Sequence, residues 1–142
     1  MARPSRALRN HNPLNLEYRP ANGWLGLDIP PSDGRFCRFR ADLWGYRAAM
    51  IVIRRYIMLY GYNSISAIVS RWAPASDSNN TSAYIREVCR LTGYDKSAKL
   101  SWQDKTQICA LVYAMAKIES GVRREMEVIQ AAYDLCVGGV YT

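Results

Sequence analysis

Residues 42–60 read DLWGYRAAMIVIRRYIMLY, and this stretch decides the fold. Asp42 is of a residue type that caps helix N-termini, and Gly61 follows at the position where helices commonly end. Apolar side chains lie on nearly every face of the segment rather than along one stripe. The pattern predicts one long helix, buried at the centre of the protein.

Shorter helices are predicted on the C-terminal side, each from its start and stop residues. The first is expected over 65–72, started by Ser64 and stopped by Pro74, and the second from 81 to Gly93, capped by Asn80 or Thr81. The third is opened by Ser101 and Asp104, which resemble a capping box, and is ended by Gly121. The last is expected over 122–136. Residues 1–41 are rich in proline and glycine and predict irregular structure, with one short strand at 35–39. We therefore expect a mainly α-helical single domain over 1–142, with a loop-rich arm (1–41) and a helical core (42–142).

The longest apolar run, from Ala48 to Ile53, is too short to cross a bilayer, and no apolar stretch follows the basic N-terminus. We expect the protein to be made in the host cytoplasm, with no signal peptide and no transmembrane segment.

The net charge of +7 attracts any polyanion without selecting one. Because the basic residues are spread out and form no DNA-reading motif, nucleic acid is not the expected partner.

The reactive residue types narrow the chemistry. The 4 cysteines have no short pairwise spacing, and Cys109 and Cys136 fall among apolar residues as small buried side chains. His11 is the sole histidine, which leaves little for a histidine-based metal site or a catalytic triad. No metal or cofactor is expected, and hydrolytic chemistry would have to use carboxylates.

Glu119 is the carboxylate of most interest. Its spacing from Ile108, Val112 and Met115 turns it toward the apolar face of its helix, in the last turn before a glycine. Burial and the negative helix end both raise the pKa of a carboxylate, as a general acid requires. The alternative is an ordinary ion pair at the rim of the core, with Lys117, Arg123 or Arg124.

Three asparagines, Asn10, Asn12 and Asn15, crowd around Pro13. Their amides suit sugar hydroxyls or N-acetyl groups, and they equally suit the turns that asparagine forms beside proline. Several aromatic rings could stack on pyranose faces or fill the core: Trp24, Trp44, Trp72, Tyr84 and Trp102. Asp33, before Gly34, is first a turn residue and second a carboxylate candidate.

A series of motifs resembles a family of small phage and prophage proteins with an "RNNNPGNI" opening, described as virion or structural proteins with a lysozyme-like domain. The matching segments are Arg9-Asn-His-Asn-Pro-Leu-Asn-Leu, Asp33-Gly-Arg-Phe, Trp44-Gly-Tyr-Arg-Ala, Tyr60-Gly-Tyr-Asn-Ser-Ile, Arg71-Trp-Ala-Pro, Asn80-Thr-Ser-Ala-Tyr-Ile, Leu91-Thr-Gly and Ile118-Glu-Ser-Gly. They cover most of the chain in order. The resemblance implies a lysozyme-like fold and phage virion proteins as possible partners.

Three of these segments also resemble soluble lytic transglycosylases, in an order that a circular permutation would produce. Glu119-Ser-Gly is similar to the segment with their catalytic glutamate, and Asn15-Leu and Asn80-Thr-Ser-Ala-Tyr-Ile to two later ones. This likeness implies that Glu119 is the acid and base and that Tyr84 lies at the substrate site. Trp72, Thr81 and the three asparagines complete the expected substrate-binding set.

The chain departs from the phage family's pattern in three places. Leu14 stands where glycine is expected, Glu17 where a basic residue is common, and Ser120 where asparagine is usual. The change to Leu14 puts the geometry of the N-terminal loop in question, since glycine adopts conformations that leucine does not. Glu17 and Asp33 remain as competing carboxylates.

The implied function is cleavage of peptidoglycan glycan strands between N-acetylmuramic acid and N-acetylglucosamine, in the periplasm or cell wall, during infection or lysis. No convincing second carboxylate is apparent, which slightly favours a lytic transglycosylase over a muramidase. The alternative is a non-catalytic virion structural or DNA-ejection protein that keeps the fold, and a basic nucleic-acid-binding domain is a third reading.

Overall fold

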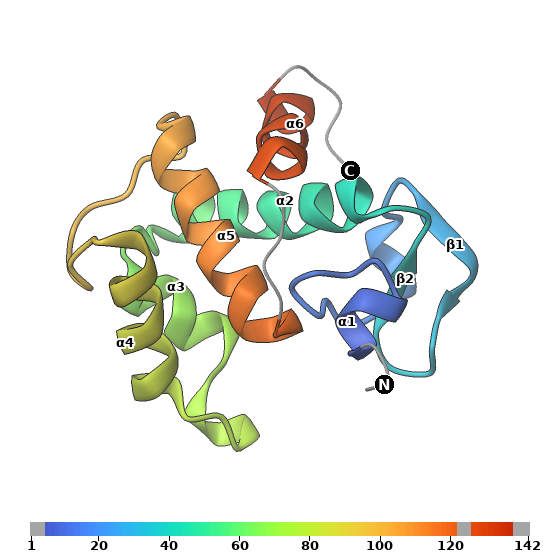
Figure 1. Ribbon diagram of the computed structural model, residues 1–142, viewed down its shortest axis with the longest axis horizontal. Helices are drawn as coiled ribbons and strands as arrows, with labels where there is room; N and C mark the ends of the chain where they lie inside the picture. Colours follow the sequence, from blue (N-terminus) through green and yellow to red (C-terminus); the bar gives the residue numbers. More distant parts are fainter. Residues whose placement is uncertain (1–4, 122–125, 138–142) are drawn as a thin grey trace.

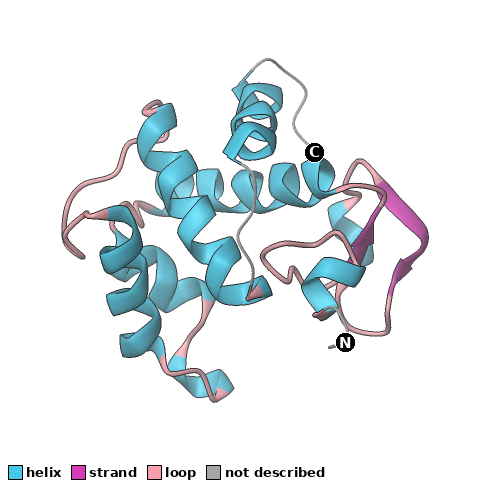
Figure 2. Cartoon of the chain, viewed as in Figure 1, coloured by secondary structure: helices cyan, strands magenta, loops and turns pink. Residues whose placement is uncertain are grey.

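A computed structural model describes residues 5–121 and 126–137 (Figures 1 and 2). The described part is mainly α-helical, with one small antiparallel sheet. Its elements in chain order are α1 (Arg6–Arg9), the 3-10 helix η1 (Pro20–Asn22), β1 (Leu27–Ser32), β2 (Cys37–Phe39), α2 (Asp42–Tyr60), α3 (Ile65–Trp72), the 3-10 helix η2 (Ala75–Asp77), α4 (Thr81–Thr92), α5 (Lys105–Ser120) and α6 (Met126–Val137).

Helix α2 is the central element, as predicted, and the other helices surround it (Figure 1). Its bounds match the sequence pattern, and Gly61 ends it in the left-handed conformation at φ 71°. The residue at the N-cap is Ala41 rather than Asp42, which is instead the first helical residue. Burial is confined to the first two thirds of α2, because Met58, Leu59 and Tyr60 are exposed.

The N-terminal arm is more regular than predicted. The expected strand within 35–39 is confirmed as β2, but α1 and β1 were missed. Strand β1 contains Pro30 and Pro31, which cannot donate to a ladder and which hide a strand in the sequence. Its pairing with β2 is correspondingly irregular between the matched pairs Leu27–Phe39 and Ser32–Cys37.

Helices α3, α4 and α5 begin at side-chain caps. Asn80, one of the two expected caps, accepts a hydrogen bond from the Ala83 amide and caps α4. The capping box expected at Ser101 is wrong: Asp104 alone caps α5, and the Ser101 hydroxyl donates to Gln103 instead. The last helix is confirmed as α6 from residue 126 onward, and residues 122–125 lie outside the described residues.

The arm and the helices share one hydrophobic core, which includes Leu14, Cys37 and Phe39 from the arm. At Gly45 the start of α2 lies directly against the arm: a Cβ there would be 2.3 Å from the His11 carbonyl oxygen. The end of α5 meets α1, so it lies between the arm and the pair α3 and α4 (Figure 1). This junction positions the candidate site.

None of the helices in the described residues is long and apolar enough to span a membrane.

We predict that Gly45→Ala destabilises the protein by about 1–2 kcal/mol. Alanine ordinarily gains about 1 kcal/mol over glycine within a helix. Here the new methyl group would meet a backbone oxygen and the Pro13 ring, at 2.7 Å from Pro13 Cδ, and neither can move cheaply. Urea unfolding followed by circular dichroism measures the change. Ser70→Ala, at an exposed position of α3, is the matched control, and an equally stable Gly45→Ala would contradict the packing described.

Candidate functional site

Glu119 is the next-to-last residue of α5, just before the left-handed Gly121 at φ 76°. Ile108, Val112 and Met115, the apolar residues with which it was expected to share a face, are buried. Glu119 itself is only partly buried, at the edge of the core. The expected orientation is therefore found, and the side chain is not sealed inside the protein.

Three hydrogen-bond donors from three different elements converge on the Glu119 carboxylate. The Tyr84 hydroxyl of α4 donates to Oε2 at 3.0 Å, and the Asn15 amide of the arm reaches Oε1 at 3.4 Å. The Trp72 side chain, at the end of α3, is the third donor. Asn15 also lies 3.4 Å from the backbone oxygen of Glu119, which belongs to the unpaired last turn of α5.

Burial raises the pKa of Glu119, because it disfavours the charged form. The three hydrogen bonds act in the opposite direction but do not cancel the effect. Burial and the neighbouring carboxylate together raise the pKa of Tyr84 well above its ordinary value, so Tyr84 remains a donor.

The alternative of an ordinary ion pair finds no support among the described residues. Glu119 forms no ion pair there, and the nearby Lys117 is exposed. Arg123 and Arg124, the other expected partners, lie outside the described residues.

Asn15 adopts the left-handed conformation at φ 54°, which asparagine tolerates better than most residues. From this backbone conformation its side chain reaches Glu119 of α5. Its Oδ1 atom is buried and has no hydrogen-bond partner in the described residues, and the same holds for Nε1 of Trp24. One acceptor and one donor are thus unpaired beside the same groove.

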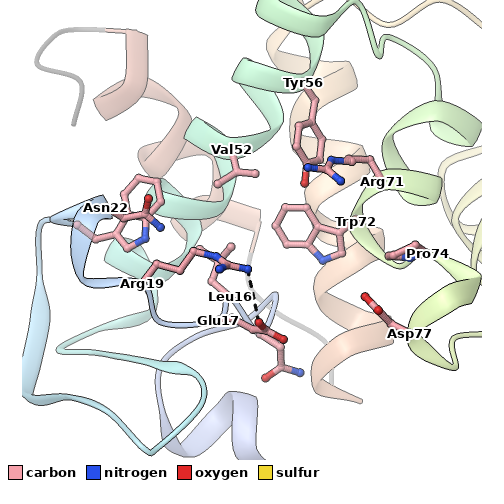
Figure 3. Close-up of a pocket in the computed structure, with 12 residues that line it drawn as sticks. Leu16, Glu17, Arg19, Asn22, Val52, Tyr56, Arg71, Trp72, Pro74 and Asp77 are labelled. Atoms are coloured by element: carbon pink, nitrogen blue, oxygen red, sulfur yellow. Dashed lines mark ion pairs between the residues drawn. The ribbon is translucent and has the colours of Figure 1, made fainter.

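The groove has a volume of about 340 Å³ and lies between the arm and the end of α3 (Figure 3). The arm forms one wall, α2 contributes Val52 and Tyr56, and the end of α3 with the following loop forms the other wall. Its lining residues are Asn15, Leu16, Glu17, Arg19, Asn22, Trp24, Val52, Tyr56, Arg71, Trp72, Pro74 and Asp77. Two of the residues that hold Glu119, Asn15 and Trp72, line the groove, whereas Glu119 itself is not among the lining residues.

The competing carboxylates differ in position. Glu17 lines the groove, but it is exposed and paired with Arg35 at 3.1 Å and Arg19 at 3.8 Å. Asp33 does not line the groove, and its carboxylate accepts hydrogen bonds from the Arg35 and Phe36 amides of the turn that follows it. Burial raises the pKa of Asp33, but hydrogen bonds from Asn10, Phe36, Arg6 and Arg35 outweigh burial and hold that pKa well below its usual range. An acid that must carry a proton near neutral pH cannot be Asp33.

Three further candidates support the backbone rather than line the groove. Asn10 is buried and donates to Asp33 at 2.9 Å. Asn12 is fully buried and bonds the backbones of Leu16 and Cys37. The Thr81 hydroxyl donates to the Ala73 carbonyl at 2.6 Å, which ties the start of α4 to the end of α3.

The groove also contains residues that were not expected: Arg19, Tyr56, Arg71 and Asp77. Of these four, only Arg71 could have been found from the sequence, because it precedes Trp72 in a segment that resembles the phage family.

The cysteines are all free, and Cys109 and Cys136 are buried as predicted. No cluster suited to a metal ion occurs within residues 5–121 and 126–137.

Fold and site thus define a mainly α-helical protein with a partly buried carboxyl group whose partners Asn15 and Trp72 line a surface groove. No family model matches the chain. The chain is 38% identical over 122 residues to Protein P5 of Pseudoalteromonas phage PM2, which covers 82% of this chain and 72% of that protein. It belongs to the family of this phage protein, and the bacteriophage connection expected from the sequence is supported.

We predict that Glu119→Gln stabilises the protein at pH 8 and leaves its stability unchanged below about pH 4. An unfolded glutamate has a pKa of about 4.3, and the folded value is higher. The wild type therefore loses stability as pH rises from about 4 through the folded pKa, whereas glutamine does not titrate. Thermal unfolding across this range measures the difference. Glu127→Gln, exposed on α6, is the control, and a less stable Glu119→Gln at pH 8 would count against the buried acid.

We predict that Asn12→Ala lowers the free energy of unfolding by about 2–4 kcal/mol, because it leaves buried backbone groups of the arm unpaired. Asn79→Ala removes one bond, to Pro74, at an exposed position and should change stability by less than about 0.5 kcal/mol. Urea unfolding compares them. Similar losses in both variants would argue against the supporting role of Asn12.

Proposed function

We propose that the protein is a phage-type peptidoglycan glycosidase of lysozyme-like fold, with Glu119 as the acid that protonates the leaving oxygen between N-acetylmuramic acid and N-acetylglucosamine. The observation that carries the proposal is the arrangement around Glu119. A carboxyl with a raised pKa is held by Asn15, Trp72 and Tyr84, and two of these line a groove.

This arrangement suits both the donation of a proton by Glu119 and the stabilisation of the carboxylate that donation leaves. Burial favours the protonated carboxyl, which is the form that donates to the glycosidic oxygen. After transfer, the donors from Tyr84, Asn15 and Trp72 stabilise the carboxylate that remains. The same carboxylate then acts as the base that takes a proton from the attacking hydroxyl.

The unpaired atoms beside the groove support an N-acetylated sugar as substrate. An acetamido group offers one N–H donor and one carbonyl acceptor. Asn15 and Trp24 both line the groove, and their Oδ1 and Nε1 atoms are a buried acceptor and a buried donor without partners in the described residues, which would have to turn toward the groove to bond such a group. Trp72 adds an aromatic ring, on which the apolar face of a pyranose can stack.

The lining favours the route in which a hydroxyl of the muramic residue attacks and an anhydro sugar forms. An inverting hydrolase needs a second carboxylate to activate water, about 6.5–9.5 Å from the acid. Glu17 is exposed and already engaged by two arginines. Asp77, at the other wall, is the remaining candidate for that role.

The phage relative supports a place for this activity in infection or lysis. In either setting the protein would act on the periplasmic cell wall, and carriage in the particle would make other virion proteins its partners. The permuted order of the transglycosylase-like segments is part of the same proposal: Glu119 comes from late in the chain, Asn15 from its start, and the two meet in space.

We predict that Glu119→Gln lowers the rate of muropeptide release from purified peptidoglycan by about 10²–10⁴-fold, the usual contribution of a positioned acid. Glu127→Gln should keep full activity, and Asp77→Asn should keep it if the product is an anhydro sugar. Zymography measures the activity of each variant. Mass analysis identifies the product, since anhydro and reducing ends differ by one water. Undiminished release by Glu119→Gln would transfer the role to Glu17. A wild-type protein without any release would favour the non-catalytic virion protein.

A further inference from the structure

The groove carries two positive side chains on opposite walls, Arg19 from the arm and Arg71 from α3 (Figure 3). Their electrostatic situations differ. Arg19 lies 3.8 Å from Glu17, so its charge is partly balanced within the protein. Arg71 forms no ion pair with any carboxylate of the described residues, although Asp77 lines the same groove. The groove therefore offers one guanidinium for a group from outside.

Arg71 is connected to the candidate acid through its neighbour in the chain. It directly precedes Trp72, which hydrogen-bonds Glu119, so the end of α3 fixes both residues on one wall. Figure 3 shows the Arg71 guanidinium beside Tyr56, with the Trp72 indole next to it and facing the groove. A negative group bound by Arg71 would thus lie beside Trp72, which holds the Glu119 carboxylate.

A guanidinium recognises a carboxylate with two parallel hydrogen bonds, which gives geometric as well as charge selectivity. Two kinds of N-acetylated glycan differ in this respect. Strands with muramic acid carry carboxylates, on the lactyl group when it is bare and on the peptide stem when one is attached. Polymers of N-acetylglucosamine alone carry none.

We propose that Arg71 binds a carboxylate of the glycan and makes the groove selective for acidic N-acetylated strands over neutral ones. This inference rests on the proposed function, because it assumes that a glycan occupies the groove. It assigns Arg71 as a specificity-determining residue that leaves the acid chemistry to Glu119.

The test measures binding in the Glu119→Gln background, so that bound strands are not cleaved. The probes are N-acetylglucosamine oligomers, peptide-free muramic strands and peptide-bearing strands of equal length, titrated by calorimetry. Arg71→Gln should weaken binding of an acidic strand about tenfold and leave the neutral oligomer unchanged. Arg71→Lys should recover part of the loss. Arg86→Gln, at an exposed arginine of α4 outside the groove, is the matched control.

The pattern of loss identifies the carboxylate. A loss on peptide-free strands assigns the lactyl group, and a loss on peptide-bearing strands alone assigns the stem. Equal affinity for neutral and acidic strands, with no effect of Arg71→Gln, overturns the assignment of Arg71 and leaves the glycosidase proposal standing. Failure of every glycan to bind overturns both proposals.

Discussion

Partial burial of the Glu119 carboxyl against three donors is the constraint on which the arrangement depends. Burial alone would keep the group neutral, and the hydrogen bonds alone would keep it ionised. The donors come from the arm, α3 and α4, while the acid comes from α5. All four segments must therefore be held in register, and the core around α2 provides that support.

The close approach at Gly45 explains how the arm is kept in place. A side chain at this position would force α2 away from the loop of residues 11–13. Asn12, only one residue after His11, ties the same loop to β2 by a bond to Cys37. The loop then turns at Asn15 into the left-handed conformation that directs its amide to Glu119. A packing contact without chemistry of its own thus sets the geometry of the acid's surroundings.

Helix bounds could be predicted because they depend on local residues: Gly61, Gly93 and Gly121 each end a helix in the left-handed conformation. Strand β1 could not be predicted, since proline is rare within strands and the sequence of β1 contains Pro30 and Pro31. The orientation of Glu119 followed from helical spacing. The three asparagines look alike in the sequence, and only the folded arm shows that Asn15 reaches Glu119 while Asn10 and Asn12 bond within the arm. Arg71 belongs to a resembling motif but was not predicted as a site residue, because its lack of an ion pair with the carboxylates of the described residues is a tertiary property that no local pattern encodes.

The partners Asn15 and Glu119 are separated by 104 positions in the chain. A ribosome must therefore complete nearly all of α5 before the Glu119 carboxylate can meet the first residue that holds it. Nascent chains and fragments that end before residue 119 lack this carboxyl altogether. Under the function proposed above, such incomplete copies would have no wall-cleaving activity, which would protect the producing cell.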